Sequence, residues 1–128
     1  MTEDIIIKTA NKLPKIEIFP KVFGRFFPSG NKTMMMLVEI PSKLSVPKHR
    51  HKNEQMGLCI SGKAEFISGK EKKIVEKGTS YYIASNIEHS VKIISKEKGV
   101  FLDIFIPPRK DYIEKIRNVK NHWNKIGV

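Results

Sequence analysis

The sequence has little cysteine and no long apolar run, and both absences exclude something. Cys59 is the only cysteine in 128 residues, so no disulfide can form within the chain, and a cytoplasmic setting fits. No stretch of ~18 apolar residues is present, so the sequence offers no membrane-spanning helix. The first residues, Met1 to Asp4, are acidic, which is not typical of a signal peptide. We therefore expect a cytoplasmic protein without a membrane partner.

Arginine is also scarce, although the chain is basic. The net charge is +11, yet only four of the 24 basic residues are arginine. The lysines are scattered between Lys8 and Lys125 without a basic block or a helical stripe. Because arginine is the better reader of phosphates and bases, we expect no nucleic-acid partner. The positive field would instead attract small anionic molecules.

The length and the turn signals predict a single all-β domain over residues 1–128. Between about residues 14 and 106, short strand-like segments alternate with turns every 8–12 residues or so, the pattern of a sandwich or barrel. No repeat or linker divides the chain. The expected strands are 16–19, 22–27, 33–40, 55–60, 64–67, 72–75, 79–83, 89–94 and 100–106.

A single helix is expected to follow the last strand, over about 111–125. Pro107 and Pro108 end strand pairing because neither can donate a backbone hydrogen bond. Asp111 can then cap the helix. Apolar residues at helical spacing predict one stripe against the barrel, formed by Tyr112, Ile116, Val119 and Trp123. His122 lies beside this stripe and is expected at the surface.

The last expected strand is apolar on both faces, which predicts additional cover. One face carries Val100, Leu102, Ile104 and Ile106, and the other carries Phe101, Asp103 and Phe105. We expect a homodimer, in which the Ile- and Phe-rich N-terminal strands pair with or cover a neighbour. The C-terminal helix is the alternative source of this cover.

Asp103 lies between two phenylalanines, where a carboxylate is costly to bury unless it is paired or used. One interpretation is an ion pair with Arg109 or with a lysine. The other is a carboxylate that faces an enclosed pocket, where desolvation raises its pKa towards general acid/base catalysis.

A candidate metal site is formed by three histidines and a glutamine. Side chains two apart in an extended strand point the same way, so His49 and His51 can both offer an imidazole nitrogen. Gln55 can add an amide oxygen from the next strand, and His89 begins a later one. This donor set suits Zn²⁺, Fe²⁺, Ni²⁺, Cu²⁺ or Mn²⁺. The alternative is an exposed basic loop and a structural histidine, since the pair is surrounded by Lys48, Arg50 and Lys52.

These residues resemble the two sequence motifs of a small single-domain cupin. The first motif, H-x-H-x3-E-x6-G, is matched in spacing by His49, His51, Gln55 and Gly62; the second, G-x5-P-x-G-x2-H, by Gly78, Ala84, Asn86 and His89. The departures are Gln55 for glutamate, Ala84 for proline and Asn86 for glycine, and Lys43 stands where a further glycine is expected. Asparagine also tolerates a left-handed turn. The resemblance implies a jelly-roll β-barrel.

Within the cupins, His-x-His-x3-Gln followed by Asp-x-Phe-x-Pro-Pro-Arg is similar to the KdgF-like group, over roughly residues 30–113. That group linearises unsaturated uronic sugars. The resemblance implies that Asp103, Phe105 and Arg109 are catalytic, with Arg109 fixing a substrate carboxylate by paired hydrogen bonds. Tyr82 and Phe105 would shape the pocket. Related small cupins include BacB-like isomerases of bacilysin synthesis and a nucleoside-aldehyde dehydratase of pacidamycin synthesis, so the substrate stays open.

We therefore expect a metal-assisted isomerase or lyase for an anionic sugar-like substrate, such as a uronate, a sugar nucleotide or a keto compound. A divalent transition metal, Ni, Fe, Zn or Mn, would be held by the candidate site. Because Gln55 is neutral, it leaves the ion's charge uncompensated, which strengthens the Lewis acid and weakens metal retention. The alternatives are an Fe-dependent cupin dioxygenase and a non-catalytic sugar- or ligand-binding cupin.

Overall fold

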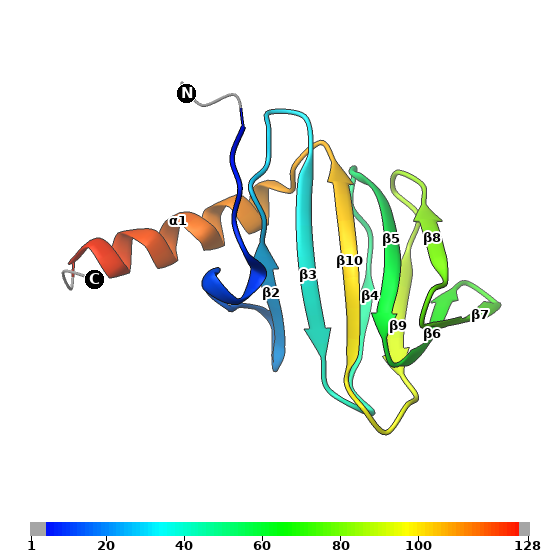
Figure 1. Ribbon diagram of the computed structural model, residues 1–128. Coiled ribbons are helices and arrows are strands. Elements are labelled where there is room, and N and C mark those ends of the chain that lie inside the picture. Colours follow the sequence, from blue (N-terminus) through cyan, green and yellow to red (C-terminus); the bar gives the residue numbers. More distant parts are fainter. Residues whose placement is uncertain (1–4, 126–128) are drawn as a thin grey trace.

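The computed structural model describes residues 5–125, and the side chains as far as residue 119. Ten strands precede one long helix (Figure 1). A short 3₁₀ helix, η1, spans Ala10–Lys12. The strands are β1 (Ile16–Phe19), β2 (Val22–Phe26), β3 (Met34–Ile40), β4 (Ser45–His49), β5 (Glu54–Ser61), β6 (Lys63–Ser68), β7 (Glu71–Glu76), β8 (Ser80–Ile83), β9 (His89–Ile93) and β10 (Gly99–Ile106), and α1 spans Lys110–Lys125.

Two antiparallel sheets form the domain, which confirms the predicted all-β jelly roll with one C-terminal helix. The larger sheet has the strand order β1-β2-β3-β10-β5-β8, and the smaller has the order β4-β9-β6-β7. Nine of the strands lie close to the expected ranges. The tenth, β4, was not expected as a separate strand, because its sequence is polar and contains Pro47.

The core lies between the facing sides of the two sheets. On β3, the alternation places Met34, Met36, Val38 and Ile40 inward, as the sequence predicted. The largest side chains with less than 2% exposure are Phe101, Phe105, Ile93, Val22 and Cys59. Residues from both sheets thus close one apolar core, and the polar site occupies one end of the same interior.

The N-terminal strands pack onto this chain's own barrel. Ile16, Ile18 and Val22 are buried, and Phe19 and Phe26 pack against the core cluster. These apolar side chains thus contribute to the core of their own chain, and the expected homodimer stays a prediction. Strands β1 and β2 extend the larger sheet instead of projecting from it.

Helix α1 leaves the barrel at one side and packs against β1 (Figure 1). Tyr112 is 3% exposed, Ile113 packs against the core, and Ile116 and Val119 are half-buried, so the predicted stripe is confirmed as far as residue 119. The side chains of His122 and Trp123 lie outside the described residues. Over the described part of the chain, no helix combines the length and apolar character needed to cross a membrane.

Candidate metal centre

The three predicted histidines converge at one end of the barrel. His49 ends β4 and His89 begins β9, and the two residues are direct cross-strand partners. Their ring centroids are 4.3 Å apart, and that of His51 is 5.5 Å and 5.1 Å from them. One ligand nitrogen from each ring lies within 4.8 Å of the others. His51 lies in the loop after β4. The path of this loop brings His51 beside His49, whereas the sequence analysis expected both residues on one strand.

The protonation of the three rings is set by the backbone. The Nδ1 atoms of His49, His51 and His89 lie 2.8, 2.9 and 2.8 Å from the carbonyl oxygens of Pro47, Asn53 and Ile87. A carbonyl only accepts, so Nδ1 carries the proton and the Nε2 lone pair is free. Burial is the main cause that lowers the pKa of each ring below its usual value. All three rings are thus prepared as neutral ligands.

Gln55 completes the donor set from the opposite sheet. Its Oε1 atom is 3.1 Å from His51 Nε2, and its side chain also hydrogen-bonds to Asp103. A carboxylate accepts, so the amide NH₂ of Gln55 is directed to Asp103 and the amide oxygen to His51. Two lone pairs then face each other, an arrangement that a cation between them would stabilise. Three imidazole nitrogens and one amide oxygen fit a divalent transition metal.

Asp103 faces the same cavity, 5% exposed, and its hydrogen-bond partners are neutral. The Tyr81 hydroxyl donates to its Oδ1 at 2.5 Å, and Gln55 is the second partner. Burial raises the pKa of Asp103 to about 6, although both hydrogen bonds and the Arg109 charge oppose the shift. Asp103 is therefore a desolvated carboxylate in a pocket, which was the second interpretation of the sequence. The catalytic role of Asp103 stays a prediction.

Arg109, which was the candidate ion-pair partner of Asp103, pairs with Asp111 instead. Its Nε and Nη2 atoms lie 3.2 and 2.8 Å from the two carboxylate oxygens of Asp111. The guanidinium carbon lies 3.9 Å from the ring centroid of Tyr112 and 5.3 Å from that of Phe105. Arg109 is 7% exposed and Phe105 is 1% exposed, and both line the cavity beside the histidines.

Tyr81, and not Tyr82, lines this cavity. Tyr82 is 62% exposed on the outer face of β8, where its hydroxyl donates to Glu54. Tyr82 instead lines a groove that opens beside the cavity, so its part in shaping the substrate pocket stays a prediction, and Tyr81 joins it as a lining residue. The register is the physical reason, since Tyr81 pairs with the inward-facing Gly57 and Tyr82 with the outward-facing Met56.

Gly57 makes the contact between Tyr81 and Asp103 possible. It is the cross-strand partner of both residues, on β8 and β10 respectively. A Cβ atom at this position would collide with the Asp103 carboxyl and with the Tyr81 ring. The missing side chain lets the phenol reach across β5 to the carboxylate. Sequence reasoning missed Tyr81 and Gly57, although a glycine inside a strand is a signal of close approach.

Two departures from the family pattern occupy left-handed turns. Asn86 has φ 62° and Lys43 has φ 68°, and both stand where the motif has glycine. The Asn86 backbone N–H also donates to His51 O at 2.8 Å, which ties the loop before His89 to the loop after His49. The turns that glycine would form are thus kept without glycine.

Two hollows adjoin the site. The cavity at the histidines is only about 50 Å³, enough for an ion and very few waters. A groove of about 430 Å³ opens beside it, between β6–β7 and the edge strand β8. Phe66, Tyr81 and His89 line both hollows, so they form the wall between them.

The two-sheet barrel and the histidine site together define a cupin. Residues 36–105 match the family model described as "Cupin domain", so the chain belongs to the cupin family. It is 30% identical over 105 residues to the H2HPP isomerase of Bacillus subtilis, an alignment that covers 81% of this chain and 42% of that protein. The chain thus spans less than half the length of this curated relative.

Solved cupins have the same fold at low sequence identity. An RmlC-like cupin from Shewanella frigidimarina superposes with a TM-score of 0.77 at 15% identity, covering 88% of this chain and 99% of that one. KdgF from Halomonas sp. superposes with a TM-score of 0.75 at 17% identity, covering 81% and 96%. At these identities the likeness shows the fold alone.

Proposed function

We propose that this protein is a metal-dependent isomerase or lyase for a small anionic, oxygen-rich substrate. The contact between His51 Nε2 and Gln55 Oε1 carries the proposal, because two acceptors face each other where two further imidazoles converge. A desolvated carboxyl stands beside them. The isomerase activity of the curated relative supports the choice of reaction class.

The metal would be held by His49, His51, His89 and Gln55. Ni, Fe, Zn and Mn all accept nitrogen and oxygen ligands of this kind. When bound, the ion supplies Lewis acidity that polarises a carbonyl or hydroxyl oxygen. Because all four donors are neutral, the protein does not reduce the charge of the ion.

Asp103 would move the proton that an isomerisation or elimination requires. With a pKa of about 6, both its acid and its base form are present near neutrality. It can therefore remove a proton from one atom of the substrate and return it to another. Tyr81 fixes the position of the carboxyl through the hydrogen bond to Oδ1.

The substrate would lie partly in the groove beside the metal cavity. The metal cavity alone is too small for a sugar or keto acid, whereas the groove has the volume of a small-molecule site. Arg109 and Phe105 line the metal cavity and not the groove, so they would contact the part of the substrate that reaches the metal, Arg109 by pairing with its carboxylate. An unsaturated uronate, a keto acid and a deoxysugar nucleotide all offer this chemistry.

The test is to purify the protein, determine its metal, and assay it with and without oxygen on unsaturated uronates, keto acids and deoxysugar nucleotides. We expect a product of unchanged mass for an isomerase, or of reduced mass for a lyase. Turnover that requires oxygen and a product containing added oxygen would identify a dioxygenase. Tight binding with the ligand recovered unchanged would identify a binding protein.

The variant Asp103→Asn separates catalysis from metal binding. We expect loss of turnover with the metal content unchanged. Glu54→Gln is the matched control, since Glu54 is an adjacent carboxylate that faces outward and bonds Tyr82. Loss of metal in Asp103→Asn would assign Asp103 a structural role and would contradict the proposed mechanism.

A further inference from the structure

The groove beside the metal cavity is apolar where it meets the cavity. Phe66 and Tyr81 line both hollows, and their ring centroids are 4.6 Å apart. Both flanking strands and the loop before His89 contribute further apolar side chains to the groove, namely Val75, Ile83, Ala84 and Ile87. A molecule that extends from the metal cavity into the groove therefore meets a continuous apolar wall.

Strand pairing directs the wall residues inward. Cross-strand partners share one face of a sheet. Val75 is paired with Ala64, which is 0% exposed, and Ile83 is paired with Gln55 of the metal site. Ile87 differs from these residues, because it is 46% exposed although it lies two residues before His89. Ile87 is thus an aliphatic side chain at the edge of the site that is free to contact a bound molecule.

The polar side chains of the groove are mostly bonded within the chain. Four of the five hydroxyl groups that line it have a partner there. Ser68 donates to a backbone carbonyl at 2.8 Å, and Thr79 accepts from a backbone N–H at 3.3 Å. Tyr81 and Tyr82 donate to carboxylates. A sugar needs a partner for each hydroxyl that it buries, and the side chains of this groove offer few.

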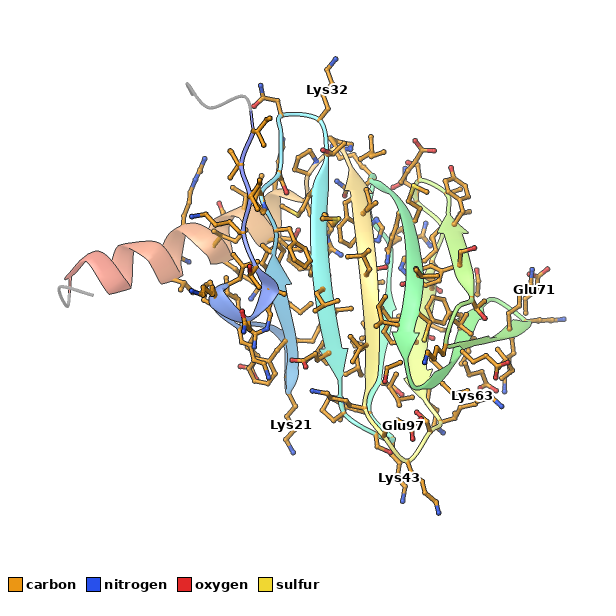
Figure 2. The ribbon with its side chains drawn as sticks, viewed as in Figure 1. Lys21, Lys32, Lys43, Lys63, Glu71 and Glu97 are labelled. Carbon is orange, nitrogen blue, oxygen red and sulfur yellow. The ribbon has the colours of Figure 1, made fainter. Side chains whose placement is uncertain are left out.

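The charged side chains lie at the outer end of the groove. Among the described residues that line it, Lys73 is the only lysine or arginine, and its Nζ atom is 3.7 Å from a carboxylate oxygen of Glu71. Figure 2 shows Glu71 at the tip of the β6–β7 hairpin, away from the barrel. A diphosphate needs several cationic or N–H donors. One lysine that already contacts a carboxylate does not provide them.

We propose that the substrate is a carboxylate whose remaining part is apolar, and that this apolar part binds in the groove between Phe66 and Ile87. This inference rests on the function proposed above, in which the metal and Arg109 hold the polar head of the substrate. It also narrows the candidates. A keto acid with an apolar carbon skeleton fits the groove, whereas the hydroxyls of a uronate and the phosphates of a sugar nucleotide would lack partners there.

The test is isothermal titration calorimetry of the metal-containing protein with three 2-hydroxycarboxylates. Lactate is the polar head alone. The acid 2-hydroxy-4-methylpentanoate adds an apolar branch to this head, and gluconate has the same number of carbons but a hydroxyl group on each carbon of its tail. We expect 2-hydroxy-4-methylpentanoate to bind at least tenfold more tightly than gluconate, and more tightly than lactate, because even one methylene group in an apolar pocket changes selectivity about tenfold or more.

The variant Ile87→Ser tests the apolar wall itself. We expect it to bind 2-hydroxy-4-methylpentanoate at least tenfold more weakly than the wild type and to keep the wild-type affinity for lactate. Ile94→Ser is the matched control, since Ile94 is aliphatic and 43% exposed but does not line the groove. Both affinities should be unchanged in this control. Ile87→Ala replaces Ile87→Ser if circular dichroism shows the latter to be unfolded.

Lactate binding separates a failure of this inference from a failure of the proposed function. If lactate binds, but gluconate binds as tightly as 2-hydroxy-4-methylpentanoate, the apolar groove is overturned and the metal site is not. An unchanged affinity for the branched acid in Ile87→Ser, or an equal loss in Ile94→Ser, would also overturn it. Absence of binding by all three acids would overturn the proposed metal site and this inference together.

Discussion

At the scale of single residues, Gly57 makes a sharp prediction. Alanine here would place a methyl group against the Asp103 carboxyl and the Tyr81 ring. We expect Gly57→Ala to separate the two side chains and to lower kcat at least tenfold. Overpacking should also lower the free energy of unfolding by about 1–3 kcal/mol. Steady-state kinetics and denaturant unfolding measure the two effects.

The control for Gly57→Ala is Gly30→Ala. An added Cβ at Gly30 meets no atom within 4 Å, so stability should change by no more than about 0.5 kcal/mol. Metal content should be unchanged in both variants. If Gly57→Ala folds and keeps wild-type kcat, the hydrogen bond from Tyr81 is not needed to position Asp103.

Gln55 leads to a prediction about charge. Glutamate has nearly the same shape as glutamine but adds a negative charge to an otherwise neutral donor set. We expect Gln55→Glu to bind the metal at least tenfold more tightly and to turn over substrate more slowly, because the ion becomes a weaker Lewis acid. Competition with a chelator measures retention. Equal or weaker retention in Gln55→Glu would contradict a metal contact at residue 55.

The neighbours Tyr81 and Tyr82 show which features could be predicted from the sequence. The metal ligands could be identified because their spacing is a motif. Which side chains of β8 face the interior could not be predicted. In Ser80-Tyr81-Tyr82-Ile83, each of the two alternating faces carries one tyrosine. The direction of these side chains is set by pairing with β5, a contact between segments some 25 residues apart, which the local pattern does not reveal.

At the scale of elements, the edge strand β7 bears on where the substrate lies. Lys73 lines the groove beside the metal cavity, whereas Lys72, its neighbour, faces the opposite side of the sheet. We expect Lys73→Ala to raise KM for an anionic substrate several-fold with little change in kcat. Lys72→Ala, which removes the same charge 1 residue away, should leave KM near the wild-type value.

A KM that stays at the wild-type value in both lysine variants would place the substrate elsewhere than in this groove. A similar rise in both would instead reflect the general field of a basic protein. Increasing salt separates these cases, since it screens a long-range field more than a direct contact. The Lys72 and Lys73 pair therefore distinguishes a binding group from net charge.

The elements themselves were largely predictable, because alternation and turn residues act locally. The exception is β4, where Pro47, lysine and histidine hide a strand that the partner β9 imposes. The sequence also left open whether a neighbouring chain or the C-terminal helix covers the second apolar face of β10. Its double-sided apolarity required a second layer, but only the path of α1 shows that the helix does not supply it.

At the scale of the whole molecule, the metal site joins the two sheets. His49 and His89 belong to the smaller sheet and Gln55 to the larger one. A bound ion would therefore link both layers of the barrel, and it would bind the folded chain and not the unfolded one. At a free metal concentration 100 times the Kd, such binding stabilises the fold by about 2.7 kcal/mol.

We therefore expect metal removal by a chelator to lower Tm by roughly 10 °C for a domain of this size, and re-addition to restore it. His49→Ala should abolish this difference, because it removes a ligand from one of the two linked sheets. His122→Ala removes the one histidine outside the triad and should keep the difference intact. The measurement is thermal unfolding at fixed metal concentration, followed by circular dichroism. A chelator-induced shift that persists in His49→Ala would mean that the ion binds elsewhere, and the two sheets would then be joined only by their apolar core.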